Sequence, residues 1–83
     1  MKKIIDFWAP WCKACRDLEP ILAEAAEKIE VIRINVDEDP GSANDYQVMS
    51  LPTVILFDDK NGMSRINGSS LANIARIKTF AGL

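Results

Sequence analysis

The sequence predicts one α/β domain, residues 1–83, built on a four-stranded mixed sheet with helices on both faces. A chain of 83 residues is long enough for a single domain. Short β-forming runs alternate with helical patterns in the order β-α-β-α-β-β-α. Two helical crossovers imply parallel strands, and an Asn61-Gly62 turn adds one antiparallel strand at the end.

Two different patterns of apolar residues predict the first strand and the first helix. Residues 4–8 form a short apolar and aromatic run, which is typical of a buried strand. Residues 12–29 are predicted to be helical, because apolar side chains recur there at helical spacing. Pro20 lies inside this helix and is expected to kink it, since proline lacks the amide donor.

The remaining elements follow from β-branched runs and turn residues. In chain order they are a strand at 30–36, an acidic turn at 37–41, a short helix at 42–48, a strand at 53–57, a hairpin turn at 58–62 and a returning strand at 63–66. Ser69 or Ser70 caps a last helix. We expect this helix to bury four apolar side chains, those of Leu71, Ile74, Ala75 and Ile77.

Composition excludes several classes of function. The formal net charge is -2 and there is no histidine, so nothing favours nucleic acid or an anionic membrane, and histidine-based catalysis is excluded. Asp6 interrupts the apolar run that a signal peptide would need, and no stretch approaches the ~20 apolar residues of a membrane span. We therefore expect a cytoplasmic monomer that binds no metal.

The residues that carry chemistry are Cys12 and Cys15. Two residues separate them, and they lie where the first strand gives way to the first helix. There Cys12 faces unpaired backbone amides at the positive end of the helix, which favours its thiolate, and Lys13 adds positive charge. Cys15 lies one turn further in and is expected to be less exposed. Cys12 is then the nucleophile in disulfide exchange, and Cys15 resolves the mixed disulfide.

Two alternative roles of this pair are a structural disulfide and a metal site. A purely structural disulfide would close a very small loop and would be unusual in the cytosol. A metal site would need ligands from a second chain, because one Cys-x-x-Cys pair supplies only two of the four ligands that structural zinc requires.

Asp6 and Pro52 are the other informative residues. Alternation places Asp6 on the same face of its strand as Ile4 and Trp8, where burial would raise its pKa. It is a candidate proton acceptor for Cys15 through water. The alternatives are an ion pair with Arg33 on the next strand or a partly exposed edge position. Pro52, taken alone, is a proline at the entry to a strand.

Together these motifs resemble the thioredoxin family over essentially the whole chain. Residues 7–15, Phe-Trp-Ala-Pro-Trp-Cys-Lys-Ala-Cys, are similar to that family's active-site segment. Asp6 is similar to its buried acidic residue and Pro20 to the proline that kinks its active-site helix. Arg33 falls where a lysine is usual. Leu51-Pro52-Thr53 resembles its cis-proline loop, and Gly62 and Gly68 fall near its two glycines.

The resemblance implies the thioredoxin-like fold and a substrate surface. It implies that Pro52 is cis and packs beside the disulfide, and that the backbone of Leu51 pairs with an extended substrate segment. It also implies an apolar docking patch formed by Trp11, Ala14, Leu51 and Gly68.

Three departures from the family pattern bear on these expectations. Lys13-Ala14 replaces the usual Gly-Pro between the cysteines, which points toward a more oxidising pair. The usual first strand and helix are absent, so the strand at 4–8 is expected at or near an edge of the sheet. Arg33 stays charged under all relevant conditions and could hold Asp6 ionised more firmly.

The sequence thus predicts a protein-disulfide oxidoreductase, an electron carrier in cell redox homeostasis. It would cycle between dithiol and disulfide, with no bound organic cofactor, and pass electrons from a flavin-dependent thioredoxin reductase to protein disulfides. The main alternative is a glutaredoxin-like protein reduced by glutathione; Trp11 and Asp6 favour the thioredoxin type, whereas the short chain leaves the alternative open. A non-enzymatic docking module and a metal carrier bridging two chains are the remaining possibilities.

Overall fold

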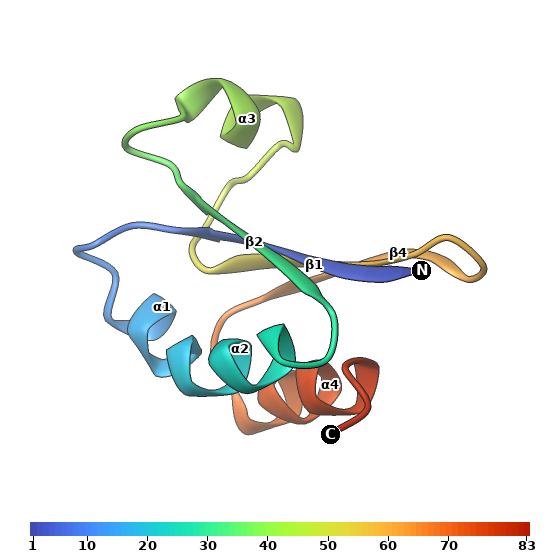
Figure 1. Ribbon diagram of the computed structural model, residues 1–83. Coiled ribbons are helices and arrows are strands. Elements are labelled where there is room, and N and C mark those ends of the chain that lie inside the picture. Colours follow the sequence, from blue (N-terminus) through green and yellow to red (C-terminus); the bar gives the residue numbers. More distant parts are fainter.

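A computed structural model describes residues 1–83 and contains one sheet with strand order β2-β1-β3-β4 (Figure 1). Strand β1 (Lys2–Trp8) pairs in parallel with β2 (Glu30–Asn35). On its other side β1 pairs antiparallel with β3 (Thr53–Asp58), which in turn pairs antiparallel with β4 (Gly62–Asn67). The predicted four-stranded mixed sheet is confirmed. The expectation that both helical crossovers give parallel strands is wrong for the second, because β3 enters the sheet on the far side of β1 and runs antiparallel to it.

Helices cover both faces of this sheet, as predicted. Helices α1 (Lys13–Asp17), α2 (Glu19–Ala26) and α4 (Leu71–Phe80) lie on one face, and α3 (Pro40–Asp45) lies on the other (Figure 1). The loop between β1 and α1 therefore leaves the sheet at the carboxyl end of a central strand, and α1 begins at that end.

Alternation along β1 divides the core between the two faces. Ile4 belongs to the larger cluster, which includes residues of α2, β3, β4 and α4. Ile5 and Phe7 belong to the cluster on the α3 side, where the Phe7 ring lies 5.3 Å from that of Tyr46. Asp6 thus shares the face of Ile4, as the period of a strand requires.

The expected edge position of the first strand is wrong. Strand β1 lies in the middle of the sheet, between β2 and β3. Four successive side chains of β1, from Ile4 to Phe7, are no more than 5% exposed. A strand that is buried on both faces has a nearly continuous apolar sequence, and such a sequence is typical of an interior strand.

The single kinked helix expected at 12–29 is two helices. Helix α1 ends at Asp17, Leu18 lies at the junction, and α2 begins at Glu19. Pro20 therefore lies in the first turn of α2, where an amide has no intrahelical partner to lose. Helix α2 ends at Ala26, three residues earlier than expected.

The two later helices also differ in detail from expectation. Helix α3 starts at Pro40 rather than at Ser42, because the Asp39 carboxylate caps it by accepting from the Ser42 amide. Ser70 caps α4, as predicted. However, Leu71 is 85% exposed and Ala75 is also exposed. Ile74 and Ile77 of α4 pack against the core, together with Ala81, the residue that follows the helix.

Candidate active site

The two cysteines lie at the start of α1, where the strand-to-helix junction was predicted. Cys12 is the N-cap of α1, and the pair forms a disulfide with its Cα atoms 5.3 Å apart. Cys12 is 7% exposed and Cys15 is 1% exposed, in the expected order. The backbone amide of Cys15 donates to Sγ of Cys12 at 3.2 Å. Helix α1 has only five residues, and this hydrogen bond from its first turn is a direct contact of a backbone amide with the Cys12 sulfur.

Hydrogen bonds fix the loop that presents Cys12. The Cys12 amide donates to the carbonyl of Ala9 at 3.1 Å, and the Arg16 guanidinium donates to the carbonyl of Pro10 at 2.8 Å. The Trp11 indole donates to the Asp37 carboxylate at 3.0 Å, although Trp11 is itself 68% exposed. Arg16 and Asp37 were not singled out from the sequence.

The Lys13 ammonium does not stand free beside the cysteine pair. It lies 3.4 Å from the Asp17 carboxylate, one helical turn further along α1. Its side chain is 81% exposed, so water also screens its charge. Asp17 and water both weaken the field of the Lys13 ammonium, and its expected effect on Cys12 stays a prediction.

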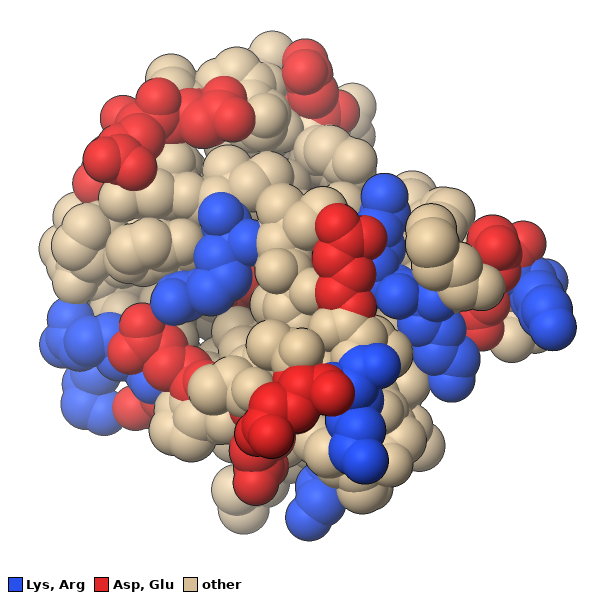
Figure 2. All heavy atoms as spheres, viewed as in Figure 1, with Lys and Arg blue, Asp and Glu red and all other residues tan.

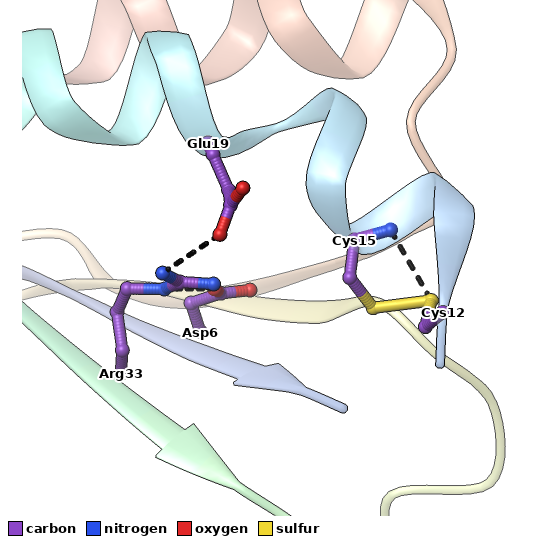
Figure 3. Close-up of polar contacts among 5 residues, drawn as sticks. All are labelled: Asp6, Cys12, Cys15, Glu19 and Arg33. Carbon is purple, nitrogen blue, oxygen red and sulfur yellow. Dashed lines mark hydrogen bonds and ion pairs between the residues drawn. A yellow bond between two sulfur atoms is a disulfide. The ribbon is translucent and has the colours of Figure 1, made fainter. Parts of the chain in front are cut away.

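Asp6 is buried beside the disulfide. The residue is 0% exposed, and its Oδ2 atom accepts a hydrogen bond from Nε of Arg33 at 3.0 Å. Its Oδ1 atom is buried without a hydrogen-bond partner in the protein. Burial raises the pKa of Asp6 above its ordinary value, and the hydrogen bond and charge of Arg33 only partly oppose this rise. Figure 3 shows the carboxyl between Arg33 and Cys15, with one oxygen directed toward the side of the disulfide.

Arg33 has a second acidic partner that the sequence did not reveal. Its Nη1 atom lies 3.2 Å from Glu19 Oε2, and its guanidinium lies 4.5 Å from the centre of the Trp8 ring. Glu19 and Arg33 lie 14 residues apart, on α2 and β2. No helical spacing relates them, so no local pattern could have indicated the contact.

The loop before β3 approaches the disulfide from the other side. The peptide bond between Leu51 and Pro52 is cis. The Pro52 carbonyl accepts from the amide of Gly68, a glycine with φ +91°, at 3.0 Å. The Thr53 hydroxyl donates to the carbonyl of Ser50 at 2.6 Å, which ties the loop back on itself.

An apolar groove of about 340 Å³ runs between Cys12 and this loop. Trp11 and Cys12 line one side of it. The other lining residues are Val36, Ala43, Val48, Met49, Ser50 and Leu51. Ala14 and Gly68, expected in the same patch, do not line it: Ala14 packs against the cysteine cluster, and Gly68 binds the Pro52 carbonyl.

Comparison with known proteins places this arrangement of residues in a family. A family model described as thioredoxin matches residues 1–80. The chain belongs to the thioredoxin family. The thioredoxin of Staphylococcus epidermidis is 40% identical over 70 residues, which cover 80% of this chain and 67% of the relative. That of Staphylococcus aureus is 39% identical over the same lengths.

Solved thioredoxin structures show the same fold. A mutant thioredoxin from Halobacterium salinarum is 32% identical with a TM-score of 0.79, covering 99% of this chain and 76% of that one. Oxidised mitochondrial thioredoxin 3 from Saccharomyces cerevisiae is 30% identical with a TM-score of 0.77, covering 94% and 77%.

As a thioredoxin family member, the protein is a thiol-disulfide oxidoreductase that acts on protein disulfides. The Cys12–Cys15 pair has the spacing of its redox centre. No group of three or more His, Cys, Asp or Glu side chains is arranged to hold a metal ion. None of the helices has the length and hydropathy that crossing a membrane requires.

Proposed function

We propose that the dithiol form of this thioredoxin reduces disulfides in proteins and is regenerated by a flavin-dependent thioredoxin reductase. The observation that carries this proposal is the asymmetry of the pair. Cys12 caps α1 and lines the open groove, whereas Cys15 is 1% exposed beneath it. One sulfur is thus placed to meet a partner and the other to attack the first.

In this scheme Cys12 is the nucleophile. Its thiolate attacks one sulfur of the substrate disulfide; a bond forms between Cys12 and the substrate, and the other substrate sulfur leaves as a thiolate that takes a proton from water. Cys15 then loses its proton and attacks Sγ of Cys12. The Cys12–Cys15 disulfide forms, the second substrate thiolate is released, and two electrons have passed to the substrate.

Asp6 is the proposed acceptor of the Cys15 proton, through water. Its carboxyl faces the disulfide (Figure 3), and its raised pKa suits a base that must take up a proton near neutral pH. Arg33 supports it by holding the other oxygen at 3.0 Å.

Substrate binding is assigned to the groove and to the loop beside it. An extended substrate segment would add to the backbone of Leu51 next to cis-Pro52, with an apolar side chain against Trp11. Lys13, Ala14 and Gly68 shape the surroundings without lining the groove.

We further propose that the protein works in the cytosol as a monomer without a bound organic cofactor. The cysteine pair itself holds the two electrons, so no second redox group is needed. A reducing compartment keeps such a pair available as a dithiol.

The test is insulin-disulfide reduction with two electron supplies, NADPH with thioredoxin reductase and NADPH with glutathione and glutathione reductase. We expect turnover with the first supply and none above background with the second. The substitution Cys12→Ser should abolish insulin reduction with the thioredoxin reductase supply. Turnover with glutathione alone would favour the glutaredoxin-like alternative, and full activity of Cys12→Ser would overturn the mechanism.

A further inference from the structure

Arg33 stands between two carboxylates that differ in burial. The side chain of Asp6 is 1% exposed and that of Glu19 is 46% exposed, with Arg33 between them at 33%. Nε of Arg33 donates to Asp6 at 3.0 Å, and Nη1 donates to Glu19 at 3.2 Å (Figure 3). A single guanidinium thus links a buried acid to one at the surface.

Arg33 and Glu19 are the charged groups that act on Asp6, and the cysteine pair lies on the other side of its carboxyl (Figure 3). The neighbour of Asp6 across β3 is Val54, and α4 and β4 contribute apolar side chains to this face, Ile77 and Ile66. Arg76 and Lys78, the charged residues of α4, are exposed. The protonation of Asp6 is therefore governed by burial and by the group of three charged residues that Asp6 forms with Arg33 and Glu19.

We propose that Glu19 is a positioning residue for the proton transfer at Asp6, serving as the alternate counter-ion that keeps Arg33 paired when Asp6 is protonated. The proposal rests on the proton-transfer role given to Asp6 above. It concerns how the charge of Arg33 stays paired while Asp6 gains and loses a proton. Glu19 itself touches neither the substrate nor the cysteines.

The physical reason is the balance of charge in a half-buried site. With Asp6 ionised, the three groups carry a net charge of one negative unit. When Asp6 takes up a proton, the Arg33–Glu19 ion pair remains and the group is neutral. Without Glu19, the same step would leave Arg33 as a half-buried cation with no partner, which is unfavourable.

Two further observations agree with this role. The charge of Glu19 raises the pKa of Asp6, adding to the larger effect of burial. The Arg33 guanidinium lies 4.5 Å from the centre of the Trp8 ring, which holds the planar group where both carboxylates can reach it. The fixed fork of arginine can bind two acids at once, whereas the single ammonium of lysine has no such geometry.

The test compares Glu19→Gln with Glu24→Gln, which removes the same charge from an exposed position of the same helix. The side-chain carboxyl of Asp6 is titrated by NMR in the oxidised protein, and the rate of insulin reduction by pre-reduced protein is measured against pH. In Glu19→Gln we expect both midpoints to fall by about 0.2–0.7 pH unit, the range that an exposed ion pair supports. Glu24→Gln should leave both midpoints unchanged. Glu19→Asp keeps the charge, and its midpoints should return at least halfway to those of the unsubstituted protein.

An Asp6 midpoint in Glu19→Gln equal to that in Glu24→Gln would overturn the proposal. The NMR titration needs no turnover, so this result is separate from any failure of the redox cycle. A shifted NMR midpoint with an unshifted rate profile would overturn the role of Asp6 in proton transfer, and the proposal with it. Loss of insulin reduction in the unsubstituted protein would instead contradict the proposed function.

Discussion

The backbone amide of Cys15 donates a hydrogen bond to Sγ of Cys12, with 3.2 Å between nitrogen and sulfur. In the dithiol form the same amide is placed to stabilise a thiolate at Cys12, because hydrogen bonds to an ionised acceptor are stronger than those to a neutral one. We therefore expect the reactive state of Cys12 to depend more on its own helix turn than on the neighbouring Lys13.

We expect Lys13→Ala to change the reactivity of Cys12 only slightly, since the Lys13 ammonium lies 3.4 Å from Asp17. The pH midpoint of Cys12 alkylation by iodoacetamide, followed by mass spectrometry, should move by no more than about 0.3 unit. Asp17→Asn frees the ammonium and should lower the midpoint. A rise of about one unit in Lys13→Ala would show that Lys13 acts directly on the thiolate.

Asp6 should make the stability of the oxidised protein fall as pH rises. Burial raises the pKa of Asp6 in the folded state, so between the unfolded and folded values the folded protein binds the additional proton. This contribution is fully present below the unfolded-state pKa and is lost as pH rises through the folded-state pKa. The Asp6→Asn variant has no carboxyl group at this position and therefore lacks this contribution to stability.

Urea unfolding across that window checks the sign. The free energy of unfolding of the unsubstituted protein should decrease relative to Asp6→Asn by up to about 1.4 kcal/mol per pH unit. Parallel curves for the two proteins would mean that Asp6 titrates in the folded state as it does in the unfolded chain.

Arg65 should stabilise the loop that leads to cis-Pro52. Its guanidinium, on β4, donates to the carbonyls of Tyr46 and Gln47 at the end of α3. Arg65→Met should lower the free energy of unfolding by about 0.5–1.5 kcal/mol and raise KM for insulin more than it lowers kcat. Arg76→Met, at an exposed position of α4, is the control. Equal effects of the two substitutions would exclude a specific role for Arg65.

Asp37 should matter for substrate binding through Trp11. Asp37→Ala removes the acceptor of the indole, which lies at the side of the groove. We expect KM for insulin to rise about two- to fivefold with kcat little changed, the size of one partly exposed hydrogen bond. Glu38→Ala removes a neighbouring charge and should leave KM unchanged. The same rise in both variants would point to charge rather than to the hydrogen bond.

The local features of the site were predictable from the sequence. Cys12 and Cys15 lie at a strand-to-helix junction that apolar periodicity alone locates. The face and burial of Asp6 follow from the two-residue period of a strand. The resemblance to thioredoxins added the cis bond before Pro52, which the sequence around it does not demand.

The contacts that escaped prediction join distant parts of the chain. Trp11 and Asp37 are 26 residues apart, and Glu19 and Arg33 are 14 apart. In each pair, one residue follows β1 in the chain and the other lies on β2 or just after it, so the contact arises from the tertiary fold. The helix break at Leu18 was missed for a related reason: Pro20 can kink one helix or begin another, and the pattern of apolar residues is the same in both cases.

The most direct test of the division of roles between the cysteines is trapping of the mixed disulfide. Reduced Cys15→Ser and reduced Cys12→Ser are each mixed with a protein disulfide, and the adducts are mapped by mass spectrometry. We expect a stable adduct at Cys12 in Cys15→Ser, because the resolving thiol is absent, and no adduct in Cys12→Ser. A stable adduct at Cys15 in Cys12→Ser, with none at Cys12 in the other variant, would contradict the assignment of Cys12 as the nucleophile.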